Sequence, residues 1–277
     1  MSNWRSSMSG KLGALRQEAK ASRVAVLAVL GCVLGLGVVW FLLTSIGGSG
    51  PAVSYHWDFR IVEPYLPVLL EGLGLTLELS IASIALGMAL GLFVAMARLS
   101  SIAAVRAGTT LYVEVMRGTP PLIQLVWVYY ALPVLTGIQL PAFESVVLAF
   151  TLNLGAFYGE AFRSGIQAIP QEQVEAGEIL GLSYVQRMQY VVVPQAFRIV
   201  LPVLISISIS LFKDTSLVSF LGVSDLLYQG HVVSDVTYRP LEIYTTVALL
   251  YFAIAFPITL IMRRYELHLH RHLAETK

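Results

Sequence analysis

Charge is scarce in this 277-residue sequence: Asp, Glu, Lys and Arg make up only 13% of it, whereas hydrophobic residues make up 56%. The mean hydropathy is +0.73. A chain this apolar is unsuited to a soluble domain, and its length suffices for five or six membrane helices. The net charge of +1 provides no overall basic surface for nucleic acid. We therefore expect an all-α integral membrane protein, surrounded by lipid and without a nucleic-acid partner.

The sequence also lacks the motifs of several enzyme classes. It contains no Gly-x4-Gly-Lys-[Ser/Thr] motif, so we expect no ATP hydrolysis on this chain. It contains no Gly-x-Ser-x-Gly motif, and no histidine falls well inside an apolar span, which argues against an intramembrane protease. We expect a protein that is not an enzyme and has no catalytic residues.

Cysteine occurs once, as Cys32 within an apolar run, so an intramolecular disulfide is excluded. Three histidines lie near the C-terminus, but only His268 and His272 share a helical face there. No carboxylate or cysteine motif accompanies them. We interpret this segment as a basic cytoplasmic tail and expect no metal site and no cofactor on this chain.

Six apolar spans are predicted from the hydrophobic pattern. The first follows a basic segment, as a signal peptide would, but its apolar run of 23 residues exceeds the ~7–15 of a typical signal peptide. We therefore interpret the first span as an uncleaved anchor. The predicted spans are 24–46, 72–97, 120–137, 142–162, 199–222 and 240–262.

Lysine and arginine are distributed unevenly between the segments that connect these spans. With the N-terminus inside, the outward segments carry only Arg60 and Arg239, and Lys213 lies within a span. Because cytoplasmic segments carry an excess of Lys and Arg, this distribution predicts that both termini are cytoplasmic. The inward segments 1–23, 98–119, 163–198 and 263–277 carry 5, 3, 3 and 4 of these residues.

Residues 163–198 form the longest polar interval between apolar spans. Pro170 suits the first turn of a helix and Gly181 its end, which predicts a short helix over 171–180. Two short helices joined at a glycine would make a compact projection suited to docking into another protein. The alternative, from composition alone, is an ordinary solvated loop.

The second short helix of this interval is predicted over 184–192. Ser183 is well placed to cap its N-terminus, because serine accepts a hydrogen bond from a first-turn backbone N–H. Pro194 follows the segment and is expected to stop the helix, since proline lacks the N–H that a helix interior needs.

The order of residues in this interval is more specific than its composition. Glu175-Ala176-Gly177 is followed after three residues by Gly181, and after nine more by Val191-Val192-Val193-Pro194. The spacing resembles the "EAA" loop of ABC-importer permeases, which usually reads Glu-Ala-Ala, three residues, Gly, nine residues, Ile-x-Leu-Pro. This chain departs from that pattern at Gly177, which replaces the second Ala, and at the valines, which replace Ile and Leu. Gly can loosen a helix by up to ~1 kcal/mol relative to Ala. The resemblance implies that coupling to an ATPase involves Glu175, Ala176, Gly177, Gly181 and Pro194.

Three further stretches resemble the polar amino acid uptake permeases of the His/Glu/Gln/Arg/opine type. Members of that family commonly have Tyr three residues before the Glu of the fourth span, where this chain has Phe157. The resemblance runs from about Leu69 to the end of the chain, so the first span is an addition to the family's core. The stretches are Arg117-Gly118-Thr119-Pro120, Glu160 to Pro170, and Lys213-Asp214-Thr215-Ser216-Leu217.

The resemblance implies the fold of a type I ABC importer permease, with a five-helix core and one extra N-terminal transmembrane helix. The expected parts are a basic cytoplasmic segment (1–23), the extra helix (24–46), an extracytoplasmic linker (47–68), the permease core (69–262) with its coupling loop (163–198), and a cytoplasmic tail (263–277).

The resemblance also implies an assembly in the bacterial inner membrane. The permease would pair with itself or with a sister permease and bind two ABC ATPase subunits, which would hold ATP and magnesium. An extracytoplasmic substrate-binding protein would deliver a polar amino acid. ATP binding would close the ATPase pair and turn the permease from inward-facing to outward-facing.

Polar groups within apolar spans are the candidates for the substrate path, because a zwitterion must replace the water around its ammonium and carboxylate. Lys213 and Asp214 are costly at a helix centre and should face protein or a water-filled cavity. Two arrangements remain open: Glu160 and Lys213 either pair and merely position helices, or contact the substrate. The candidates are Gln124, Asn153, Glu160, Lys213, Asp214 and Thr215.

The rival class is a secondary amino acid transporter driven by an ion gradient, to which buried Glu160, Lys213 and Asp214 would be suited. Such folds often contain inverted repeats, and this sequence shows none. The serines at 206, 208 and 210 repeat with a period of two and do not share one helical face. We interpret them as small residues that let helices pack closely.

Overall fold

The computed structural model describes residues 34–35, 37–38, 41 and 55–275. Two units make up the chain, Met1–His56 and Trp57–Lys277. In the first, the five described residues between 34 and 41 are helical. The predicted segment 1–23 and most of 24–46 lie outside the described residues, as do the side chains of His268 and His272.

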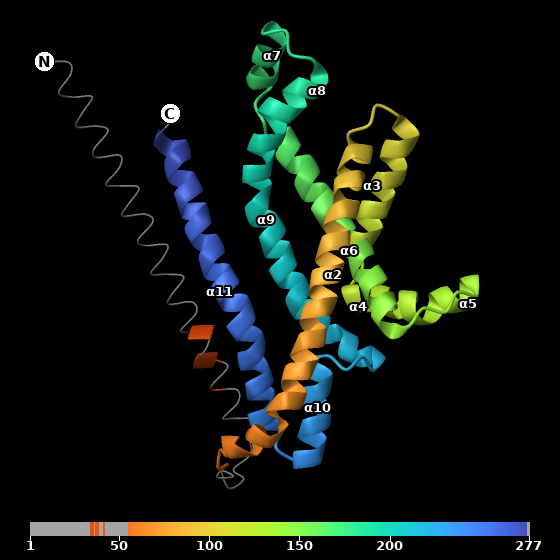
Figure 1. Cartoon of the computed structure of the whole chain (residues 1–277), viewed down its shortest axis with the longest axis vertical. Coiled ribbons are helices and arrows are strands. Elements are labelled where there is room, and N and C mark those ends of the chain that lie inside the picture. Colours follow the sequence, from red (N-terminus) through yellow and green to blue (C-terminus); the bar gives the residue numbers. More distant parts are fainter. Residues whose placement is uncertain (1–33, 36, 39–40, 42–54, 276–277) are drawn as a thin grey trace, which may run out of the picture. The chain divides into compact units, whose positions relative to one another are not determined.

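The second unit consists of helices joined by short connections (Figure 1), and no strand occurs in the part that the structure describes. The prediction of an all-α protein is confirmed. The elements are η1 (Phe59–Tyr65), α2 (Leu66–Arg98), α3 (Ala103–Gly118), α4 (Pro121–Val126), η2 (Trp127–Ala131), α5 (Leu132–Thr136), α6 (Ala142–Gln167), α7 (Gln171–Ile179), α8 (Tyr184–Arg187), η3 (Met188–Val192), α9 (Val193–Asp214), η4 (Thr215–Leu221), α10 (Leu226–Thr237) and α11 (Pro240–Glu275).

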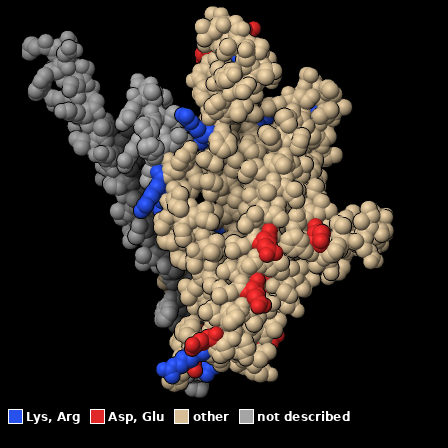
Figure 2. All heavy atoms as spheres, viewed as in Figure 1, with Lys and Arg blue, Asp and Glu red and all other residues tan. Residues whose placement is uncertain are grey.

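Four helical stretches of the described chain are long and apolar enough to cross a membrane. They correspond to the predicted spans 72–97, 142–162, 199–222 and 240–262. Within this unit, α7 and α8 lie at the same end as the C-terminal ends of α2, α6 and α11 (Figure 1). On the face drawn in Figure 2, few of the described residues are acidic or basic. The four stretches are Phe59–Arg98, Ala142–Gln167, Tyr184–Leu221 and Pro240–Tyr265.

The segment 98–119, predicted as an inward connection before a span at 120–137, is instead largely helical. Helix α3 already begins at Ala103 and packs on α2 and α6, while the apolar stretch Pro121–Thr136 is short. Extended backbone at Thr119 and Pro120 separates α3 from α4. The hydrophobic pattern missed α3 because its charged residues dilute its apolar character. Helices α3 and α4 are therefore two pieces of one broken helix.

Pro194 does not stop the second short helix, contrary to prediction. The chain stays helical from Tyr184 to Leu221 because a π-turn, η3, precedes the proline, with the Val193 N–H donating to the Met188 carbonyl. The same device precedes Pro133, where the Leu132 N–H donates to the Trp127 carbonyl. The wider turn accommodates a ring that would otherwise clash with the preceding turn and a residue that has no N–H to donate.

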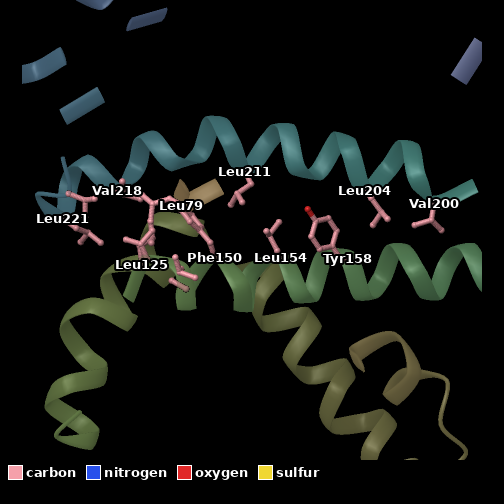
Figure 3. Packing of buried hydrophobic residues seen from close by; sticks show 14 residues of the cluster. Leu79, Leu125, Phe150, Leu154, Tyr158, Val200, Leu204, Leu211, Val218 and Leu221 are labelled. Atoms are coloured by element: carbon pink, nitrogen blue, oxygen red, sulfur yellow. The ribbon is translucent and has the colours of Figure 1, made fainter. Parts of the chain in front are cut away.

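Helix α6 occupies the centre of the core, between α2 and α9. Gly87 and Gly91 let α2 approach closely, since a Cβ at either would lie 2.5 Å from the Cβ of Leu154 or Tyr158. On the other side, Leu204 and Leu211 of α9 face α6 (Figure 3). The Tyr158 hydroxyl meets the Ser208 hydroxyl at 2.7 Å, which satisfies a buried polar group between these two helices.

A fully buried carboxyl, Asp225, caps α10 and joins it to α2. Its Oδ1 accepts from the Tyr228 N–H at 2.9 Å, and the next residue's N–H, that of Leu226, donates to Thr76 Oγ1 at 3.1 Å. Burial raises the pKa of Asp225 from its ordinary 3.8 to about 6, although hydrogen bonds from backbone N–H groups oppose the shift.

The raised pKa of Asp225 predicts that the folded protein loses stability as the pH rises. A carboxyl whose pKa is higher in the folded state stabilises the fold below its unfolded pKa, and this contribution disappears as the pH passes through about 6. We expect the permease in detergent to lose about 2–3 kcal/mol between about pH 4 and pH 7, seen as a falling thermal-unfolding midpoint. Asp225→Asn, which retains an acceptor for Tyr228, should abolish this dependence; an unchanged pH profile in that variant would contradict the assignment.

Candidate functional site

Two cavities follow one another along the groove between α6 and α9. The first, here the Asp214 cavity, has a volume of 180 Å³ and is lined by Asn153, Asp214, Ser206 and Ser210 among others. The second, the Glu160 cavity, has a volume of 530 Å³ and includes Arg117, Glu160 and Ser164 in its lining. It lies nearer to α7, because its lining extends to Ala168 at the end of α6.

The polar lining of the Asp214 cavity comes from two helices. Ser206, Ser210 and Asp214 follow one another at four-residue intervals and so lie on one face of α9. Across the groove, Asn153 of α6 is buried and donates from Nδ2 to Gln124 Oε1 at 3.0 Å. A carboxylate beside two hydroxyls is a set of acceptors that suits an ammonium group.

Gln124 stabilises the break between α3 and α4. Its Nε2 donates to Thr119 Oγ1 at 2.7 Å and to the Met116 carbonyl at 2.8 Å, while its Oε1 accepts from Asn153. Its exposed surface faces a separate, mainly apolar cavity of 330 Å³. Gln124 therefore holds Asn153, which lines the Asp214 cavity, but does not line that cavity itself.

One of the predicted arrangements paired Glu160 with Lys213. Glu160 instead takes part in an ion-pair network with two arginines. Arg98 of α2 forms an ion pair with Glu160, and Arg163 Nη2 lies 2.5 Å from Glu160 Oε1. The network joins α2 to α6 and leaves Glu160 half-buried at the wall of its cavity.

Lys213 and Thr215 lie outside both cavities. Lys213 is exposed and lines a 290 Å³ cavity between α9 and α11 together with Arg263. Ser206 and Ser210 line this cavity as well as the Asp214 cavity. Thr215 is fully buried, and its hydroxyl donates to the Phe212 carbonyl at 2.7 Å. Of the six predicted path residues, the structure thus places Asn153 and Asp214 in one cavity and Glu160 in the next.

Sequence reasoning missed three residues of these cavities. Ser206 and Ser210 were interpreted as packing residues, but they line the Asp214 cavity, and it is Ser208 that contacts Tyr158 of α6. Their four-residue spacing, extended to Asp214, was the signal that could have identified them. Arg117 was counted with an inward loop, but it ends α3 and lines the Glu160 cavity.

The predicted short helices at 171–180 and 184–192 are present as α7 and α8 with η3. Gly181 has a φ of 75° and lies in the turn between them, where glycine avoids the strain that a side chain would bring. Its N–H donates to the Glu178 carbonyl at 2.9 Å, and the Leu182 N–H donates to the Gly177 carbonyl at 3.1 Å. The Ser183 side chain caps α8 in a reciprocal arrangement with Gln186, as predicted for the cap.

The turn between α7 and α8 carries an apolar tip, which we define as Ile179, Leu180, Tyr184 and Val185. Ile179 and Leu180 are 87% and 78% exposed. An ion pair between Glu178 and Arg187 joins the two helices beside it. Contiguous exposed apolar side chains favour a protein-docking surface over a simple solvated loop.

The predicted coupling residues contribute to this projection in different ways. Glu175 and Ala176 are exposed on α7, and Gly177 is buried, with its Cα facing the Arg187 side chain. Gly181 forms the turn, whereas Pro194 lies in the first turn of α9, away from the apolar tip. Three of the five thus belong to α7 itself.

Apolar spanning helices, cavities with polar lining residues between two of them and an exposed apolar tip at one end are features of a membrane transport subunit. The family described as "Binding-protein-dependent transport system inner membrane component" matches residues 66–271. The chain belongs to this family. It is a multi-pass inner-membrane protein, the permease component of an ABC importer, and not an enzyme.

Individual relatives agree with this assignment. The chain is 36% identical to the L-cystine transport system permease protein TcyB of Bacillus subtilis, over 79% of this chain and 93% of that protein. It is 34% identical to the glutamine transport system permease protein GlnP of Escherichia coli, over 76% and 97%. A crystal structure of an amino acid ABC transporter with histidines superposes with a TM-score of 0.72 at 34% identity, over 77% and 100%. Nothing in these comparisons supports the ion-coupled alternative.

Proposed function

We propose that this permease forms the path for a polar amino acid, and that the Asp214 cavity holds the ammonium and carboxylate end that all such substrates share. The observation that carries the proposal is the meeting of Asp214, Ser206 and Ser210 with Asn153 in one cavity between α6 and α9. Cystine and glutamine permeases among the relatives support the substrate class.

The apolar tip and its two short helices are the proposed contact with an ATPase that holds ATP and magnesium. The exposure of Ile179 and Leu180 supports this role, because interface energy concentrates in a few large apolar side chains. We further propose that two permease chains, this one twice or with a sister, complete the assembly with two ATPase subunits. An extracytoplasmic binding protein would deliver the substrate.

The proposed orientation places the α7–α8 end and both termini in the cytoplasm. Support comes from the Lys and Arg distribution, since Arg263 and Arg264 of α11 and Arg98 of α2 belong to ends that lie together with α7 and α8 (Figure 1). The segment 24–46 is proposed as an added anchor outside the path, because the family match begins at residue 66.

Co-purification followed by uptake tests this function. Tagged permease should bring an ATPase of the ABC type with it from its own membranes, and the reconstituted complex should take up a polar amino acid only with ATP and a binding protein. A chain lacking residues 1–51 should retain both properties. Uptake driven by an ion gradient without ATP would contradict the proposal.

A further inference from the structure

The Asp214 cavity and the Glu160 cavity share two lining residues. Phe157 of α6 and Ile207 of α9 belong to the wall of each. Beyond them the linings separate: Asn153, Ser210 and Asp214 lie on one side, and Glu160 and Ser164 lie on the side toward α7. Phe157 and Ile207 therefore stand where one cavity gives way to the other.

The break between α3 and α4 crosses the same boundary. Arg117, the last charged residue of α3, lines the Glu160 cavity, whereas Pro121, the first residue of α4, lines the Asp214 cavity. The extended residues Thr119 and Pro120 bridge the two. Gln124 fixes this bridge through its bond to Thr119, so the position of Arg117 is set by the same hydrogen-bonded network that holds Asn153.

Arg117 lies over the boundary itself. Its guanidinium carbon is 5.5 Å from the centroid of the Phe157 ring, within the range of a cation–π contact. Among the described residues no carboxylate forms an ion pair with Arg117, and Glu160 of the same cavity is paired with Arg98 and Arg163. Arg117 is thus an exposed cation at the cavity wall, and its guanidinium lies over an aromatic face while its charge also acts on Glu160 of the same cavity.

We propose that Arg117 and Phe157 form a gate between the two cavities, which a substrate carboxylate opens. The inference rests on the proposed amino acid path. A carboxylate binds guanidinium through two parallel charge-assisted hydrogen bonds, which are stronger than its contact with a ring. A substrate in the Asp214 cavity, with its ammonium at Asp214, can therefore draw Arg117 off the ring and free Phe157 to turn aside.

The test measures access to the Asp214 cavity from the α7–α8 side. In a Cys32→Ala background, Leu211→Cys places one thiol in the Asp214 cavity, which Leu211 lines. The complex with its ATPase is studied in inside-out membrane vesicles, and labelling by a membrane-impermeant thiosulfonate is timed. We expect Phe157→Leu to raise the labelling rate about two- to fivefold, the effect of losing one exposed cation–π contact, and Arg117→Gln to act in the same way.

Phe157→Tyr is the matched control, because it retains the ring and should label at the wild-type rate. In the wild-type gate, acetate, which carries the carboxylate but leaves the Asp214 cavity free for the reagent, should accelerate labelling, and Arg117→Gln should abolish that acceleration. Equal labelling rates in Phe157→Leu and the wild type, in complexes that still contain their ATPase, would overturn the gate. That result would not contradict the proposed uptake function. A wild-type complex that takes up no amino acid would overturn the proposed function and the gate together.

Discussion

Replacing Asp214 by Asn is expected to lower the uptake of every accepted amino acid by about 10- to 100-fold. The magnitude follows from losing a charged hydrogen-bond partner in a partly desolvated site, about 1.5–3 kcal/mol. The factor should be the same for each substrate, because the Asp214 cavity is proposed to hold the end of the molecule that all amino acids share. Initial rates of ATP-dependent uptake for several labelled amino acids measure this effect.

Lys213→Gln is the matched control for Asp214→Asn. It neutralises the adjacent residue of the same helix, but Lys213 lines the cavity between α9 and α11 and not the Asp214 cavity. We expect it to reduce uptake much less. A Lys213 variant as defective as the Asp214 variant, or an Asp214 variant that changes the ranking of substrates, would show that the path runs elsewhere.

Replacing Gly181 by Val is expected to reduce transport at least about tenfold by uncoupling it from ATP hydrolysis. The space around Gly181 is open, so the cost is in the backbone: its φ of 75° is strained by about 1–3 kcal/mol for a residue with a β-branched side chain. Relief of that strain would reorient α7 against α8 and displace the apolar tip. ATP hydrolysis and uptake, measured on the same proteoliposomes, give the ratio that reports coupling.

Gly177→Ala is the control for the coupling loop. A Cβ there would approach the Cγ of Arg187 at 3.2 Å, a flexible side chain that can yield, and Ala favours a helix over Gly by up to ~1 kcal/mol. We expect coupling close to that of the wild type. A Gly181→Val complex that transports normally would mean that the turn plays no part in coupling.

The fold was predictable wherever the hydrophobic pattern is continuous. Four of the spanning helices are uninterrupted apolar runs, and Ser183, Gly181 and Pro170 determine the ends of α7 and α8 through local chemistry alone. The pattern failed at α3, whose charged residues mask a packed helix, and at Pro194, where a π-turn absorbs the proline. Both failures come from backbone adjustments that depend on neighbouring helices, which no local rule includes.

The cavities were predictable only in part, for a related reason. Asn153 and Asp214 could be selected because polar groups in apolar spans are costly, but the same argument also selected Lys213 and Thr215, which face elsewhere. Neighbours on a helix differ by about 100° in direction, so adjacent polar residues belong to different surfaces. Which surface becomes a cavity depends on how α6 and α9 pack.

The uninterrupted helix from Tyr184 to Leu221 limits how this gene can vary. The apolar tip begins at one end of it and Asp214 lies near the other, with no loop between to absorb a change of length. One inserted or deleted residue would turn Asp214 by about 100° and shift it by about 1.5 Å relative to the tip. Substitutions along this helix are therefore expected to accumulate freely on its outer face, whereas insertions and deletions between Ser183 and Asp214 should be selected against.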